Sequence, residues 1–151
     1  MPTAARFNGG EGIVYHQGKI YFDTKGYDRI WMYDIAAQKI SLFYAAAWMD
    51  SPVLTGVDAL TMYDDTLLVC EDGGDMQIVA ITPAGEIKPV LQLVGYYFSE
   101  ISGAALSPDK SRLYFSSQRG VIGRLKGGVT FEVAGPFLKH FNGRQSSPAG
   151  E

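Results

Sequence analysis

Residues 12–44 read GIVYHQGKIYFDTKGYDRIWMYDIAAQKISLFY and contain four short runs rich in β-branched and aromatic residues. The runs are Gly12–Tyr15, Lys19–Asp23, Arg29–Tyr33 and Lys39–Tyr44, and turn residues separate them. Runs of this length and composition are typical of β-strands, and such short turns join neighbouring strands as hairpins. Because helical periodicity is not sustained anywhere along the chain, the sequence predicts an all-β fold.

The same pattern recurs twice further along the chain. The second round occupies about residues 58–94 and the third about residues 103–133. A period of 40 to 50 residues with four strands in each unit is typical of β-propeller blades. We therefore predict three four-stranded antiparallel blades, at about residues 10–46, 56–95 and 99–135, in one domain over residues 1–137. Residues 138–151 are predicted to form a flexible C-terminal tail.

Three blades do not close a ring, because propellers have about four to eight blades. We therefore expect half of a six-bladed β-propeller that self-associates unless its open ends are covered. The missing half is either an N-terminal part of a longer polypeptide or a second copy of this chain. The alternative is a free-standing domain of three sheets.

The composition excludes several classes of function. The chain has 151 residues, of which 46% are hydrophobic and 19% charged, and its net charge is -3. This charge argues against nucleic acid as a partner, and the longest apolar stretch, residues 40–48, is about half of what a membrane span needs. A single cysteine excludes a disulfide framework and a cysteine-rich zinc site, and the presence of only two histidines argues against a metal site built from a histidine cluster. The N-terminus carries no signal peptide, which leaves a cytoplasmic location open.

Acidic residues lie close to the start of the first strand of each predicted blade. They are Glu11, Asp58 and Glu100, and a second acidic pair, Glu71 and Asp72, ends a strand of the middle blade. First strands line the channel of a propeller, so these carboxylates are expected to converge. With no basic residue interleaved, they would repel one another unless protonated or bound to a metal. Oxygen donors without histidine suit calcium or ferric iron, and solvated loop acids are the alternative.

Other polar residues offer less chemistry. Cys70 lies inside an apolar strand and is predicted to be a buried small hydrophobe. Arg119 and the adjacent Gln118 are candidates for binding an anionic substrate, with a surface loop as the alternative. His16 lies in a predicted turn and His140 in the predicted tail, so neither is placed to act as a general base.

Five ordered motifs resemble the C-terminal half of the PhoX-type alkaline phosphatases, and together they span about residues 6–137. The motifs are Glu11-Gly12, residues 56–61 (GVDALT), residues 68–73 (LVCEDG), residues 99–109 (SEISGAALSPD), and Gln118 with residues 128–137 (GVTFEVAGPF). The resemblance implies a bacterial six-bladed propeller that is exported to the periplasm or the extracellular space. It also implies hydrolysis of phosphate monoesters with calcium and iron ions held by channel carboxylates.

The resemblance assigns metal-binding roles to particular acids. Glu11, Glu71 and Glu100 match the acidic motifs of that family, and Asp58 and Asp72 are further candidates. The substrate would be a small phosphate ester. No side chain of this chain needs to act as a nucleophile, since the metal ions would supply it.

Three features depart from the family pattern and leave two other functions open. Ala59 stands where the family has asparagine, Gly9 stands where it often has arginine, and the N-terminal half is missing. One alternative is a calcium-dependent lactonase that resembles gluconolactonase and regucalcin, which are also six-bladed propellers. The other is a non-catalytic propeller fragment that binds a partner or assembles with itself.

Overall fold

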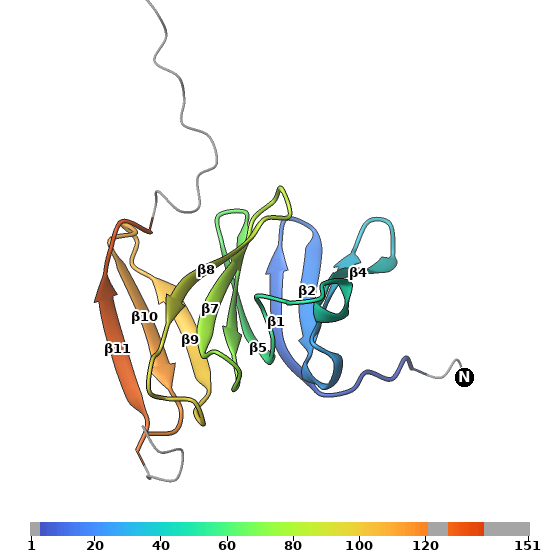
Figure 1. Cartoon of the computed structure of the whole chain (residues 1–151). Coiled ribbons are helices and arrows are strands. Elements are labelled where there is room, and N and C mark those ends of the chain that lie inside the picture. The colour runs from blue at the N-terminus through green and yellow to red at the C-terminus, as the bar shows by residue number, and fades with distance from the viewer. Residues whose placement is uncertain (1–3, 121–126, 138–151) are drawn as a thin grey trace, which may run out of the picture.

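The computed structural model describes residues 4–120 and 127–137, and these residues form three antiparallel sheets that stand side by side (Figure 1). Blade 1 consists of β1 (Gly10–His16), β2 (Lys19–Thr24), β3 (Arg29–Asp34) and β4 (Lys39–Ala45). Blade 2 consists of β5 (Val57–Tyr63), β6 (Thr66–Glu71), β7 (Gln77–Ile81) and β8 (Ile87–Gln92). Blade 3 consists of β9 (Ile101–Leu106), β10 (Arg112–Ser117) and β11 (Val129–Ala134).

The strands of each sheet follow one another in sequence order, as they do in propeller blades. The predicted all-β fold of three antiparallel blades is therefore confirmed. Blades 1 and 2 have the four expected strands, and blade 3 has three strands within the described residues. The predicted tail, residues 138–151, lies outside the described residues. Short 3-10 helices follow two of the strands: η1 (Lys25–Tyr27) comes after β2 and η2 (Ala46–Trp48) after β4.

Blade 2 is buried on both faces because it lies between the other two blades. Leu67 and Val69 of β6 belong to the core shared with blade 1, whereas Leu68 and Cys70 belong to the core shared with blade 3. This alternation makes every residue of β6 buried. The prediction that Cys70 is a buried small hydrophobe is confirmed, and burial raises the pKa of its thiol to about 12.

The first strands of neighbouring blades approach one another closely at the inner side of the sheets. A Cβ atom at Gly12 of β1 would lie 2.5 Å from the carbonyl oxygen of Asp58 and 2.7 Å from the backbone nitrogen of Leu60, both in β5. Only glycine fits this position without moving one of the strands. The contact therefore fixes how blade 1 sits against the residues that begin blade 2.

Among the described residues, no helix is both long and apolar enough to traverse a lipid bilayer.

Replacing Gly12 with alanine is expected to lower the free energy of unfolding by roughly 1–3 kcal/mol, because the new methyl group would meet rigid backbone atoms. Gly10→Ala is the matched control, since a Cβ atom there would have its nearest neighbour 4.0 Å away. Urea unfolding of both variants measures the difference. Equal losses at the two positions would contradict the close contact between β1 and β5.

Candidate functional site

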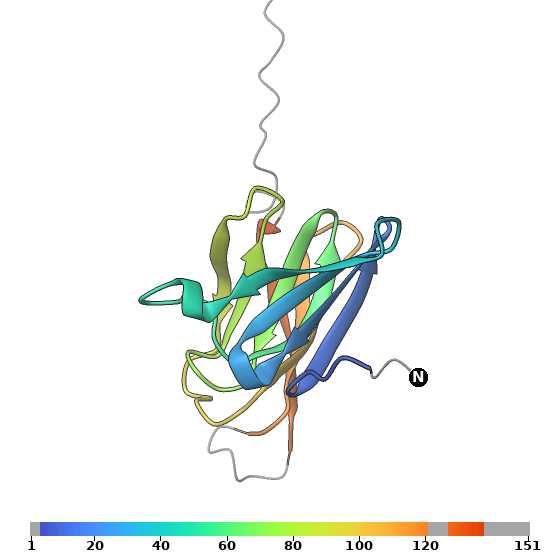
Figure 2. The same cartoon turned by 90° about the vertical axis from the view of Figure 1, so that its right-hand side faces the viewer.

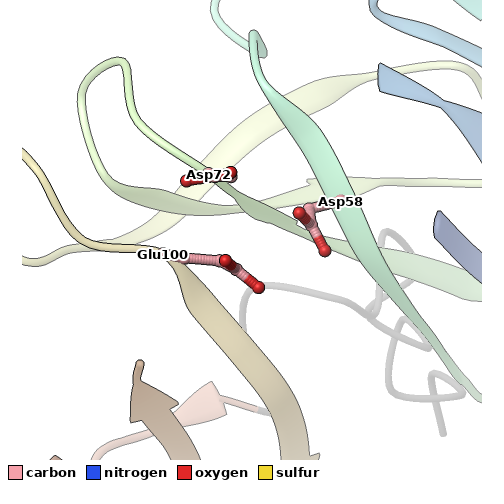
Figure 3. Close-up of side chains that lie close together, drawn as sticks. All are labelled: Asp58, Asp72 and Glu100. Carbon is pink, nitrogen blue, oxygen red and sulfur yellow. The ribbon is translucent and has the colours of Figure 1, made fainter. Parts of the chain in front are cut away.

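Three carboxylates from blades 2 and 3 meet at the end of the sheets where the first strands begin. Asp58 lies in β5, Asp72 follows β6 directly, and Glu100 directly precedes β9. Each offers an oxygen that lies within 4.8 Å of the others, and Figure 3 shows the three side chains pointing toward one another. We call Asp58, Asp72 and Glu100 the carboxylate cluster. Its members were all predicted as metal ligands, and the structure brings these three together.

Two basic side chains lie among these carboxylates. The Lys25 ammonium forms an ion pair with Asp72 and lies 3.3 Å from Asp58 Oδ2. Arg119 Nη2 donates to Asp72 Oδ1 at 3.0 Å and to Glu100 Oε2 at 2.9 Å. The prediction that no basic residue is interleaved was wrong. Both bases come from segments that follow the second strand of a blade. Of the two, the sequence pointed only to Arg119, and only as a residue that could bind an anion.

A repeated backbone hydrogen bond places the residues that carry this chemistry. In each blade, the residue after the second strand donates its N–H to the carbonyl of the residue before the first strand. The three bonds are Lys25 to Gly9, Asp72 to Gly56 and Gln118 to Glu100, each 2.8 Å long. Lys25, Asp72 and Gln118 are thus equivalent positions of the three blades, which explains why blade 1 contributes a cation where blade 2 contributes an anion.

The strand registers correct the expected equivalence of the acids. Glu11 and Asp58 are both the second residue of a first strand, but Glu100 precedes its first strand. In blade 3 the equivalent of Asp58 is Ser102. The supposed recurrence of one acidic position in three blades therefore holds for two blades, and Glu100 reaches the cluster from a different position.

Two other predicted metal ligands lie outside the carboxylate cluster. Glu11 is exposed on β1. Glu71 is fully buried, and its two carboxylate oxygens accept hydrogen bonds from the backbone N–H groups of Thr55 at 2.9 Å and Gln77 at 2.8 Å. Through these two hydrogen bonds, Glu71 joins the segment before β5 to the start of β7.

Asp23 of β2 is a buried acid that the sequence argument missed. Its Oδ1 accepts a hydrogen bond from the N–H of Gly12 at 3.2 Å, and its Oδ2 has no partner among the described residues. Burial raises its pKa to about 7, and the nearby charges of Asp58 and Glu11 act in the same direction. The available signal was an aspartate directly after three apolar or aromatic residues, 20–22, in a predicted strand.

The local electrostatics reflect partial burial of the carboxylate cluster. Burial raises the pKa values of Asp58 and Glu100, and neighbouring carboxylates add to the effect. Burial lowers the pKa of Lys25, but its hydrogen bonds and ion pairs with Asp72 and Asp58 outweigh that and leave it raised. Three anions and two cations leave one negative charge in excess, so the site is attractive to a further cation.

Two buried serines fix the main chain of Arg119. Its N–H donates to Ser99 Oγ at 2.9 Å, and its carbonyl accepts from Ser99 Oγ at 2.6 Å and from Ser117 Oγ at 2.8 Å. Gln118 Nε2 donates to Glu100 Oε1 at 2.9 Å. The two residues predicted to contact an anionic substrate therefore both contact the carboxylate cluster.

The donor chemistry of the carboxylate cluster fits a hard cation. Calcium takes six to eight oxygen ligands, and carboxylates are its preferred protein donors. The cluster supplies carboxylate oxygens only, which is the type of donor that a hard cation prefers. A cation bound by all three acids would compete with Lys25 for Asp72.

Glu71→Gln is expected to lower the free energy of unfolding by roughly 1–3 kcal/mol, because an amide accepts only one of the two backbone N–H bonds. The loss should be the same in calcium and in chelator, since Glu71 lies outside the carboxylate cluster. Thermal unfolding in both buffers measures this. A loss confined to the calcium buffer would instead make Glu71 a metal ligand.

Asp23→Asn is expected to change how stability depends on pH. In chelator, folded Asp23 keeps its proton up to about pH 7, whereas an unfolded aspartate loses it near pH 3.9. Its contribution to stability is therefore present below about pH 4 and falls by up to about 1.4 kcal/mol per pH unit until pH 7. Relative to wild type, the variant should gain stability between pH 4.5 and pH 8 in urea unfolding. A difference that does not vary with pH would contradict the raised pKa.

No family model and no curated protein sequence matches this chain. Solved structures do match it. A protein provisionally named a gluconolactonase matches with a TM-score of 0.61 and 20% identity over 87% of this chain and 47% of its own. A virginiamycin B lyase from Staphylococcus aureus, solved with quinupristin, matches with a TM-score of 0.55 and 20% identity. The match covers 85% of this chain and 42% of the lyase. A protein of unknown function from Bacteroides thetaiotaomicron matches with a TM-score of 0.58 and 14% identity. This match covers 84% of this chain and 32% of the other protein.

The gluconolactonase-like and lyase neighbours are β-propellers, and at these identities the likeness concerns the fold alone. The chain spans less than half the length of the structures that it matches. The comparisons therefore place its three sheets among β-propeller blades.

Proposed function

We propose that this chain supplies half of the channel of a six-bladed propeller hydrolase that works with a hard divalent cation, calcium in the first instance. One observation carries the proposal: Asp58, Asp72 and Glu100, from two blades, bring carboxylate oxygens within 4.8 Å of one another. Glu11 lies on the neighbouring strand β1, where further ligands from outside this chain would complete the coordination.

In this proposal the acidic residues bind the cation and the basic residues bind the substrate. A bound cation would polarise a substrate oxygen and stabilise negative charge that develops on it. Asp58, Asp72 and Glu100 would hold that cation, while Lys25 and Arg119 would be released from carboxylates that the cation neutralises. Each would then be free to donate hydrogen bonds to an anionic group of the substrate.

A lactone or a related ester is the first candidate substrate. The support is the structural likeness to the protein provisionally named a gluconolactonase, together with a site that offers carboxylates as its main donors. Hydrolysis of a lactone requires a polarised carbonyl oxygen and an activated water, both of which a single channel cation supplies.

A phosphate monoester is the second candidate. The specific support is the pair of basic side chains at the carboxylate cluster, since a phosphate dianion needs cationic donors that a neutral lactone does not. The resemblance of five sequence motifs to PhoX-type phosphatases points in the same direction, and on that reading iron would accompany calcium.

Titration of the chain with calcium, monitored by isothermal titration calorimetry, tests the cation site. Wild type is expected to bind calcium, and Asp72→Asn to bind it at least about tenfold more weakly, because one ligand charge is lost. Asp75→Asn is the matched control, since Asp75 is exposed in the same loop. No binding by wild type, or equal binding by Asp72→Asn, would contradict the proposal.

Hydrolysis assays with δ-gluconolactone and p-nitrophenyl phosphate, each with calcium and with chelator, separate the two substrates. Calcium-dependent turnover of the lactone alone selects the lactonase, and turnover of the phosphate ester alone selects the phosphatase. Calcium binding without turnover of either would support the non-catalytic alternative for this chain.

A further inference from the structure

Each blade has two faces, and the strand registers show which positions are equivalent. One face of blade 2 packs on blade 1, and its other face packs on blade 3. Blade 1 and blade 3 each have one packed face and one outer face. The outer face of blade 1 therefore corresponds to the face of blade 2 that packs against blade 1. In the same way, the outer face of blade 3 corresponds to the face of blade 2 that packs against blade 3.

The outer face of blade 1 has the composition of a core. Paired residues on this side of β1, β2 and β3 are all apolar or aromatic: Ile13, Tyr15, Ile20, Phe22, Trp31 and Tyr33. Their equivalents in blade 2 are buried or packed against the core between blades 1 and 2: Leu60, Met62, Leu67, Val69, Val79 and Ile81. Figure 2 looks onto this face of blade 1.

On β1, this outer face is not covered by any of the described residues. Ile13 and Tyr15 are 69% and 64% exposed. Phe7 covers a neighbouring part, because its ring packs edge-on against Phe22 at 5.0 Å and Trp31 at 5.5 Å. A contiguous exposed apolar surface of this kind marks an interaction site.

The outer face of blade 3 is different, because its third strand is polar. Thr130 and Glu132 of β11 face Ser116 and Tyr114 of β10. The equivalent residues of blades 1 and 2, on the faces that pack against the next blade, are apolar: Ile30 and Met32 in β3, and Ile78 and Ala80 in β7. Glu132 forms an ion pair with Arg112 at 2.9 Å, and the hydroxyls of Ser116 and Thr130 are hydrogen-bonded at 3.0 Å.

We propose that the outer face of blade 1 docks an apolar β-sheet face, and that blade 3 of a second copy does not provide it. A second copy that closed the ring head to tail would pack the face of blade 3 that carries the Arg112–Glu132 pair against the apolar outer face of blade 1. That arrangement would desolvate the ion pair without a polar partner. The partner is therefore a blade of different sequence with a row of aliphatic or aromatic side chains, as at the two packed interfaces of this chain. The inference is independent of the proposed hydrolase activity.

Matched variants of the two outer faces test this proposal in the whole chain. The double change Ile13→Lys and Tyr15→Lys alters blade 1 at exposed positions, and Tyr114→Lys alters blade 3. Light scattering gives the solution mass, and anilinonaphthalene sulfonate fluorescence reports exposed apolar surface. Circular dichroism confirms that each variant folds, and the single changes Ile13→Lys and Tyr15→Lys replace the double change if it does not.

We expect the wild-type chain to bind the dye or to self-associate. This signal should fall several-fold in the blade 1 variant and stay at the wild-type level in Tyr114→Lys. A discrete dimer of twice 16.5 kDa that both variants disrupt would overturn the proposal, because head-to-tail closure uses both faces. A wild-type monomer that binds no dye would also overturn it, since the face would then be covered from within the chain.

Discussion

Close packing between the first strands of neighbouring blades is the constraint on which the site depends. Gly12 lets β1 lie against the backbone of β5 around Asp58, and a backbone bridge between Asp72 and Glu100 ties blade 2 to blade 3. These contacts bring residues that are far apart in sequence to one end of the sheets. The apolar cores between the blades then hold the arrangement, with β6 buried on both faces.

Alternating charge is what allows three carboxylates to share this space. Lys25 links blade 1 to Asp72 and Asp58, and Arg119 links Asp72 to Glu100. The side chains are partly buried, so these ion pairs are screened less than surface pairs and each loss of a partner would leave a charge poorly compensated. The arrangement is therefore stable without a metal and still carries excess negative charge. A cation that binds here must displace the Lys25 ammonium from Asp72. Cation binding would therefore leave Lys25 free to donate hydrogen bonds to another group.

The sequence predicted the strands and the repeat because hydrophobic alternation and turn residues are local signals. It also predicted that Glu11, Asp58 and Glu100 converge, since positions near first strands meet at a channel, and it added Asp72 from the end of a second strand. Of these four acids, Glu11 lies outside the carboxylate cluster. The sequence named Arg119 as a candidate for binding an anionic substrate, but it placed neither Arg119 nor Lys25 among the carboxylates, because their contacts depend on equivalent turns in different blades. Asp23 was missed for a similar reason: its unpartnered oxygen is a property of packing. The register also separated Glu100 from Glu11 and Asp58, which no count along the chain could resolve.

The cation site is best tested by a crystal structure of the chain grown in calcium, with anomalous scattering used to locate the ion. We expect an ion bound by oxygens of Asp58, Asp72 and Glu100, with the Lys25 ammonium moved away from Asp72. Lys25 still paired with Asp72, and no ion among the three carboxylates, would contradict this expectation and leave the cluster as an ion-pair network that joins the blades.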